Sequence, residues 1–317
     1  MSSSETIPLL DLNVFANGSP KEQDEFVKML GEAFENIGFV SIKNHHLNSS
    51  IAQKLYQEVK RFFDLPLNTK MKYWEEDLAG QRGFTPFGVE HAKDKSQGDL
   101  KEFWHFGQYL PKEMKNKFAY PSNIVVEEIP AFNEIGKIAF QHLEKTGKIL
   151  LQAIANYLNI DAHFFDAYVD YGNSILRPIY YAPLTKDPKS AVRAGQHEDI
   201  NLITLLMGAS SEGLEILDKN NQWKPITSGD GELVVNVGDM LQRLTNNKMK
   251  STTHRVVNPS KENWGKPRYS IPFFLHPVAN MPLNCLENCI DKENPKQYPD
   301  ILAGDYLMQR LREIGLA

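Results

Sequence analysis

Two histidines and one aspartate in this chain have the residue types and spacing of a metal-ligand set. His197 and Asp199 flank Glu198. On a β-strand, residues two apart project on the same face, so this imidazole and this carboxylate can bind one ion. His254 lies in Ser251–Val256, which passes from polar to β-branched residues and is typical of another strand. Two imidazoles and one carboxylate leave three coordination positions open and favour Fe(II) over a closed structural zinc site.

A basic residue and a hydroxyl follow His254 at a fixed distance. Arg268 comes fourteen residues after His254, and Ser270 shares its strand face. A guanidinium binds a carboxylate through charge-assisted, bidentate hydrogen bonds, and the serine hydroxyl adds another donor. A carboxylate anchor beside an iron with open positions is what a chelating 2-oxo acid cosubstrate requires.

In this order, the motifs resemble those of the iron- and 2-oxoglutarate-dependent dioxygenases of the isopenicillin N synthase-like group. The resemblance implies that His197, Asp199 and His254 bind Fe(II). It also implies that Arg268 and Ser270 hold the distal carboxylate of 2-oxoglutarate. Further segments extend the resemblance over most of the chain: Ile7–Leu12, Gly38–Val40, Tyr180–Tyr181, Gly238–Asp239, His254–Val256 and Arg268–Phe274.

One more cosubstrate contact follows from the same resemblance. Tyr181 matches the second tyrosine of the family's Asn-Tyr-Tyr-Pro segment, and this match predicts that its hydroxyl donates to 2-oxoglutarate. The family's asparagine is replaced here by Ile179. This departure removes one hydrogen bond to the cosubstrate.

The implied activity couples oxidative decarboxylation of 2-oxoglutarate, with O₂, to oxidation of a small-molecule substrate. The sequence does not decide between hydroxylation, desaturation and cyclisation, and it does not name the substrate. A 2-oxoglutarate-independent oxidase of the same fold stays open, because isopenicillin N synthase and 1-aminocyclopropane-1-carboxylate oxidase also have an Arg-x-Ser motif. A third interpretation, a non-catalytic barrel that binds a small carboxylate, also stays open. A buried cluster of two imidazoles and a carboxylate argues against the barrel, since without a metal it costs stability.

The sequence predicts a mainly helical first half, followed by the strands that carry these residues and by a last helix. A capping box at Ser19–Glu22 and an apolar stripe predict a helix that ends at Gly38. A strand at Phe39–Ile42 and helices at Ser49–Phe63, Ile129–Leu158 and Gly304–Ile314 are also predicted. Six strands are predicted in the second half: Ser174–Tyr181, Asn201–Met207, Leu214–Leu217, Glu232–Val237, Thr252–Val257 and Tyr269–Leu275.

The order of these elements predicts an α+β protein with a double-stranded β-helix (jelly-roll) core. N-terminal helices and a long supporting helix accompany that core. We divide the chain into an N-terminal helical region with a substrate-side loop, 1–120, and a catalytic part, 121–317. The second part contains the supporting helix, the core and a C-terminal helix.

An irregular segment, Gly80–Phe106, is expected to form part of the substrate entrance. Five glycine and proline residues interrupt it, yet it retains aromatic residues, including Phe87 and Trp104. Within it, Glu102 and His105 either line the pocket or support the loop. His276 is interpreted as structural, because the ligand set is complete without it.

Composition excludes several other classes of protein. The 317 residues are 41% hydrophobic and 24% charged, as in globular proteins. A net charge of −5 argues against a nucleic-acid partner, and no apolar run predicts a membrane span. Cys285 and Cys289 are the two cysteines, too few for a disulfide scaffold. We therefore expect a cytoplasmic enzyme with a small-molecule substrate.

Overall fold

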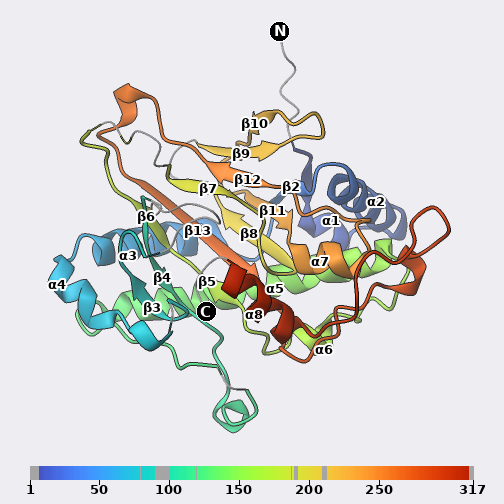
Figure 1. Cartoon of the computed structure of the whole chain (residues 1–317), viewed down its shortest axis with the longest axis horizontal. Helices are drawn as coiled ribbons and strands as arrows, with labels where there is room; N and C mark the ends of the chain where they lie inside the picture. The colour runs from blue at the N-terminus through green and yellow to red at the C-terminus, as the bar shows by residue number, and fades with distance from the viewer. Residues whose placement is uncertain are drawn as a thin grey trace.

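The computed structural model describes residues 7–78, 80–89, 100–118, 120–186, 188, 192–208 and 213–313. Its helices and strands form an α+β fold (Figure 1). The α-helices are α1 (Leu12–Asn17), α2 (Pro20–Asn36), α3 (Ser49–Phe63), α4 (Leu67–Lys70), α5 (Pro130–Tyr157), α6 (Asp166–Val169), α7 (Asp239–Leu244) and α8 (Ala303–Glu313). Short 3₁₀ helices are η1 (Met71–Tyr73), η2 (Glu76–Leu78), η3 (Lys112–Met114), η4 (Lys261–Asn263) and η5 (Glu287–Cys289). Within the described ranges, none of these helices combines the length and the apolar composition that a membrane span requires.

The strands form two sheets. The larger sheet has the order β1 (Leu9–Asp11), β2 (Phe39–Lys43), β11 (Leu233–Val237), β8 (Ile203–Met207), β13 (Arg268–Leu275), β6 (Ile179–Tyr181), β4 (Glu102–His105) and β3 (Gly83–Thr85), with β5 (Ile175–Leu176) paired to β13. The smaller sheet has the order β10 (Trp223–Pro225), β9 (Leu214–Leu217), β12 (His254–Val256) and β7 (Ala194–His197). Strands β1 and β2 are parallel, whereas the pairs that carry the candidate site residues, β12–β7 and β13–β6, are antiparallel.

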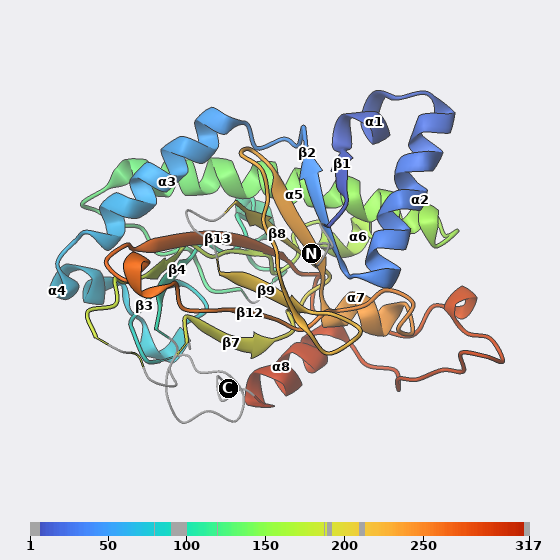
Figure 2. The same ribbon diagram turned by 90° about the horizontal axis from the view of Figure 1, so that it is seen from above.

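The two sheets enclose the cavity that contains the predicted site. Figure 2 shows α3 and α5 on one side of β8 and β13, and the smaller sheet on the other side. Residues of both sheets line the cavity between them, among them His254 on β12 and Arg268 on β13. Two facing sheets of this kind give the double-stranded β-helix core that the sequence predicts.

The long helix α5 covers the outer face of the larger sheet. It has 28 residues, with Pro130 in its first turn and a continuous buried stripe that includes Leu143, Leu150 and Ile154. Gly147 lets it approach the sheet closely, because a Cβ atom there would lie 2.9 Å from Leu275 Cδ2. The predicted supporting helix is thereby confirmed.

The N-terminal predictions are also confirmed. Ser19 and Glu22 form the capping box of α2, with Pro20 in the first turn. Gly38 follows the helix with a φ of +75°, a left-handed conformation that favours glycine. Strand β2 then begins at Phe39, as predicted.

One predicted strand is divided in the structure. The segment Ser174–Tyr181 forms two strands, β5 and β6, which are separated by Arg177 and Pro178. Proline has no N–H donor, so it cannot take a full place in the ladder. Five of the predicted strands match β8, β9, β11, β12 and β13 with small differences at their ends.

The segment Gly80–Phe106, predicted to be irregular, contains two strands. Its strands β3 and β4 extend the larger sheet. Residues 90–99 of the predicted segment lie outside the described residues. Trp104 is fully buried against Phe62 and Phe132, so it is a core residue. Phe87 is 44% exposed.

Candidate active site

His197, Asp199 and His254 come together in the lining of the cavity. Their ligand atoms all lie within 4.8 Å of one another. Asp199 Oδ1 lies 3.8 Å from His197 Nε2 and 3.7 Å from His254 Nε2. Ligand atoms about 2 Å from a shared ion lie roughly 3 Å apart, so the three side chains need only small shifts to hold one divalent cation. Imidazole and carboxylate donors suit Fe(II).

Two strands of the smaller sheet place the histidines opposite each other. His254 on β12 pairs directly with His197 on β7, and the ring centroids are 4.4 Å apart. Asp199 does not lie on this strand, because β7 ends at His197. The premise that both residues share a strand face is therefore wrong. The irregular segment after β7 brings the carboxylate to the imidazoles instead.

Backbone carbonyls set the tautomer of each histidine. His197 Nδ1 is 2.8 Å from the carbonyl oxygen of Gly195, and His254 Nδ1 is 3.1 Å from that of Thr252. A carbonyl only accepts, so each Nδ1 donates, and each Nε2 keeps a lone pair directed at the cluster. The His197 side chain is 44% exposed, but its ring faces the cavity, where desolvation and then the neighbouring His254 lower its pKa, so this imidazole is neutral at neutral pH.

Two side chains that the sequence analysis missed orient the Asp199 carboxylate. Its Oδ2 accepts hydrogen bonds from Thr204 Oγ1 at 2.6 Å and from Asn236 Nδ2 at 2.8 Å. Burial alone would raise the pKa of Asp199, but the imidazoles and these two hydrogen bonds outweigh it and lower the pKa. Asn236 could have been found, because it is the single polar residue in the apolar strand Leu233–Val237.

Arg268, Ser270 and Tyr181 line another part of the same cavity. Arg268 pairs with Tyr181 across β13 and β6, and its Cζ lies 5.1 Å from the centre of the tyrosine ring. All three side chains are buried. The alternation along β13 places Arg268 and Ser270 on one face, as the sequence predicts.

Ile179, which replaces the family's asparagine, also lines this cavity. It is buried in a small apolar cluster with Phe103 and Tyr181. An apolar side chain at this position packs against the aromatic rings and offers no hydrogen bond.

The cavity has a volume of about 570 Å³, within the range of small-molecule sites. Its acidic lining residues among the described ones, Glu198 and Asp199, lie in or beside the histidine cluster. The basic lining residues besides histidine are Lys101, Arg177, Arg268 and Arg310. Outside Glu198 and Asp199, the charged lining residues among the described ones are therefore cationic.

The segment before β6 contributes to this wall through Arg177. Its guanidinium lies 4.5 Å from the ring centre of Phe103 and 5.2 Å from that of Phe274. Its Nε donates to His105 Nε2. His105 lines the cavity, whereas Glu102 forms a buried ion pair with Lys70 and supports β4.

His276 also lines the cavity but is not part of the cluster. It is buried, and desolvation lowers its pKa to about 4.

Cys285 and Cys289 are free and buried.

The C-terminal helix α8 completes the cavity. Leu307, Arg310 and Leu311 on α8 are lining residues. Arg310 Nε lies 3.1 Å from the buried Asp239 Oδ2 at the start of α7. The amide of Asp239 in turn donates to the carbonyl oxygen of Asp199 at 2.8 Å. These contacts fix α8 relative to the candidate metal ligands.

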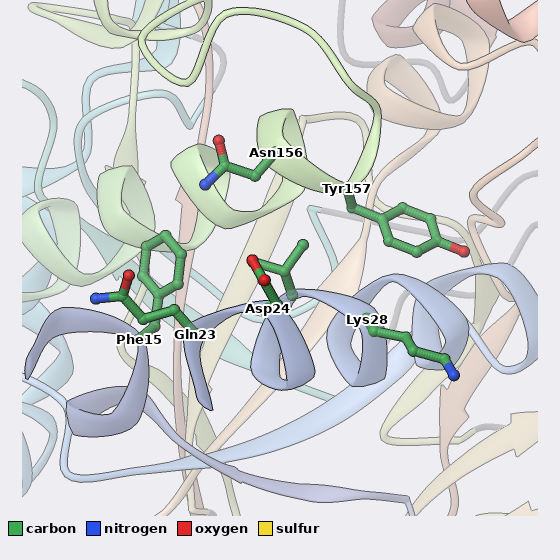
Figure 3. A pocket seen from close by; sticks show the side chains of 7 residues that line it. Phe15, Gln23, Asp24, Lys28, Asn156 and Tyr157 are labelled. Carbon is green, nitrogen blue, oxygen red and sulfur yellow. The ribbon is translucent and has the colours of Figure 1, made fainter. Parts of the chain in front are cut away.

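A second depression lies between α2 and α5 (Figure 3). It has a volume of about 300 Å³, and its lining residues include Phe15, Asp24 and Tyr157. It shares no lining residue with the larger cavity among the described residues. Nothing in its lining indicates chemistry.

Two family models match the chain. Residues 7–128 match the model described as "non-haem dioxygenase in morphine synthesis N-terminal". Residues 172–277 match the model of the 2OG-Fe(II) oxygenase superfamily. The second match contains all the predicted metal and cosubstrate residues.

Characterised relatives and solved structures extend this similarity over the whole chain. The chain is 32% identical to kihadalactone A synthase of Citrus sinensis, over 98% of this chain and 94% of that protein. A 2OG-Fe(II) oxygenase family protein from Caulobacter crescentus superposes with a TM-score of 0.87 at 43% identity, covering 97% of this chain and 99% of that chain. A full-length Neurospora crassa protein, solved in complex with alpha-KG and thymine, superposes with a TM-score of 0.86 at 28% identity, and 98% of each chain is covered.

Proposed function

The chain belongs to the 2OG-Fe(II) oxygenase superfamily, and from this premise we propose which of its residues bind the iron, the cosubstrate and the substrate. The protein is an iron- and 2-oxoglutarate-dependent oxidoreductase. One observation carries the assignment: three ligand atoms converge in a cavity whose wall also contains a buried arginine.

Fe(II) is held by His197 Nε2, His254 Nε2 and Asp199 Oδ1. The Nδ1 contacts of both histidines and the two hydrogen bonds to Asp199 Oδ2 orient these donors before the metal arrives. The distal carboxylate of 2-oxoglutarate is bound by Arg268 and Ser270, and Tyr181 donates to it from β6. Both histidines and the three proposed cosubstrate residues lie on paired strands of the core, which supports this assignment.

When bound, Fe(II) and 2-oxoglutarate supply the activation of O₂ that oxidises a C–H bond, with decarboxylation of 2-oxoglutarate to succinate. The residues of this chain bind and orient the metal, the cosubstrate and the substrate, and they exclude water from the cavity. Leu307 and Leu311 of α8 and Phe274 of β13 present apolar surface around the substrate volume. The position of the substrate carbon decides between hydroxylation, desaturation and cyclisation.

The prime substrate is a small molecule that shares the cavity with 2-oxoglutarate. The volume of about 570 Å³ supports this size class. The Neurospora crassa protein, which has the same fold, was solved in complex with alpha-KG and thymine, a small molecule of this class. The free, buried cysteines support a reducing location such as the cytoplasm.

The test is an anaerobic titration of the metal-free protein, first with Fe(II) and then with 2-oxoglutarate. We expect one equivalent of each to bind, and the second addition to produce the visible charge-transfer band of a chelated 2-oxo acid. Succinate should then form with O₂ and substrate. Iron binding without this band, and turnover without succinate, would support the 2-oxoglutarate-independent oxidase instead.

A substitution at Phe103 tests the substrate side of the cavity. Phe103 lines the cavity and stacks on Arg177, so Phe103→Leu should lower substrate-stimulated turnover by roughly tenfold. Substrate-independent decarboxylation of 2-oxoglutarate should persist, because leucine keeps an apolar side chain against Tyr181 and the iron and cosubstrate residues are unchanged. Both rates are measured as succinate formed.

Phe87→Leu is the matched control in the same segment. Phe87 is exposed and does not line the cavity, so both rates should stay at the wild-type level. Equal loss of both rates in Phe103→Leu would assign that residue to the support of the fold.

A further inference from the structure

Arg193 is a buried cation whose side chain is largely unsatisfied. It immediately precedes β7 and is 1% exposed. Among the residues that the structure describes, its Nε and Nη1 have no hydrogen-bond partner. Its Nη2 is 3.4 Å from the carbonyl oxygen of Lys266, near the limit of a hydrogen bond. Buried guanidinium groups in folded proteins normally have their donors satisfied.

A second buried arginine lies close by. The Cζ of Arg193 is 5.7 Å from the centre of the Tyr181 ring, and that of Arg268 is 5.1 Å from the same centre. Burial, and then the charge of Arg268, lower the pKa of Arg193 to about 10, so it still carries its charge at neutral pH. Two like charges buried beside one aromatic ring are unfavourable unless an anion joins them.

The described residues that line the cavity do not supply an anion beside Arg193. The acidic ones, Glu198 and Asp199, lie in or beside the histidine cluster. Lysine and arginine supply the charged groups of the remaining lining. A ligand with a negative group beside Tyr181 and Arg268 would compensate the charge of Arg193.

We propose that Arg193 is a specificity-determining positioning residue, whose charge, added to that of Arg268, selects a 2-oxo acid with a second, distal carboxylate. This inference rests on the proposed function, because it takes the part of the cavity beside Tyr181 and Arg268 as the place of the distal carboxylate. Arg193 does not itself line the cavity, so it acts through the electrostatic field at Tyr181 and Arg268.

The experiment compares two ligands and three substitutions. The ligands are 2-oxoglutarate and 2-oxopentanoate, which has a methyl group in place of the distal carboxylate. Their dissociation constants are measured anaerobically on the Fe(II)-loaded protein from the charge-transfer band, and again by calorimetry with Mn(II). Arg193→Gln and Arg193→Met remove the charge, and Arg193→Lys keeps it. Arg255→Gln is the control, because Arg255 is paired with Glu215 on the smaller sheet and does not line the cavity.

Both neutral variants should bind 2-oxoglutarate on the order of tenfold more weakly and bind 2-oxopentanoate as the wild type does. Arg193→Lys should recover most of the affinity for 2-oxoglutarate. The melting temperature of the ligand-free protein should not fall in Arg193→Met, because an unpaired buried charge is replaced by an apolar side chain of similar length.

A structural role for Arg193 predicts a different pattern. It would weaken both 2-oxo acids equally and lower the melting temperature of the ligand-free protein, and either result overturns the inference. Unchanged affinity for 2-oxoglutarate in both neutral variants would also overturn it. In that case, a normal charge-transfer band in the wild type would leave the proposed function standing.

Discussion

Replacing His254 with alanine is expected to abolish stoichiometric Fe(II) binding and all turnover while the chain stays folded. His254 supplies one of three protein ligands, and its Nε2 lies 3.7 Å from Asp199 Oδ1. Changes to groups that only orient a metal ligand typically weaken metal binding by roughly 10- to 100-fold. Loss of the ligand itself should therefore weaken Fe(II) binding by more than about 100-fold. Metal content after dialysis against Fe(II), with circular dichroism for the fold, measures this.

His276→Gln is the matched control for that substitution. His276 is a buried histidine of the same cavity, but it is not among the three clustered ligands. The His276→Gln variant should therefore retain one Fe(II) per chain. If His254→Ala also retained one Fe(II) per chain, the assignment of the iron to this cluster would be wrong.

Replacing Arg268 with alanine is expected to weaken 2-oxoglutarate binding by about 30-fold or more and to leave Fe(II) affinity nearly unchanged. Removing one partner of a buried, hydrogen-bonded charge pair typically costs about 2–5 kcal/mol, and each 1.4 kcal/mol is tenfold in affinity. Arg268 is 1% exposed, so little solvent screens its interaction with a carboxylate. Calorimetric titration of the metal-loaded protein measures both affinities.

Arg255→Ala provides the comparison for this variant. Arg255 follows His254 on β12, but its guanidinium is paired with Glu215 at 2.7 Å. Its loss should leave 2-oxoglutarate affinity at the wild-type value. Wild-type 2-oxoglutarate affinity in Arg268→Ala would eliminate Arg268 as the carboxylate clamp.

The sequence predicted the elements of the fold well, because its local patterns agree with the final packing. The apolar period of Ile129–Leu158 and the capping box at Ser19 correspond directly to α5 and α2. The single strand predicted at Ser174–Tyr181 is divided into two strands. The apolar pattern continues through this segment, but Pro178 has no N–H group and interrupts the strand pairing. Asp199 was predicted to lie on the same strand as His197, but it lies after the end of β7. A spacing of two residues does not by itself show that both residues belong to one strand.

The candidate site was predicted less completely, because part of it depends on contacts between segments far apart in the chain. Motif spacing selected His197, Asp199 and His254, which the structure brings together. The hydrogen bond from Asn236 to Asp199 joins residues 37 apart and has no motif of its own. In β4, Phe103 lines the cavity and Trp104 is in the core, and aromatic character alone does not tell which neighbour faces which side.

Helix α8 has a consequence for the order in which the wall of the cavity is completed. A ribosome makes the chain from its N-terminus, so α8 is made after every other described segment that lines the cavity. Leu307, Arg310 and Leu311 are therefore the last described lining residues to be made, and the wall is complete only once α8 has packed. The pairing of Arg310 with Asp239 then fixes α8 beside the candidate metal ligands.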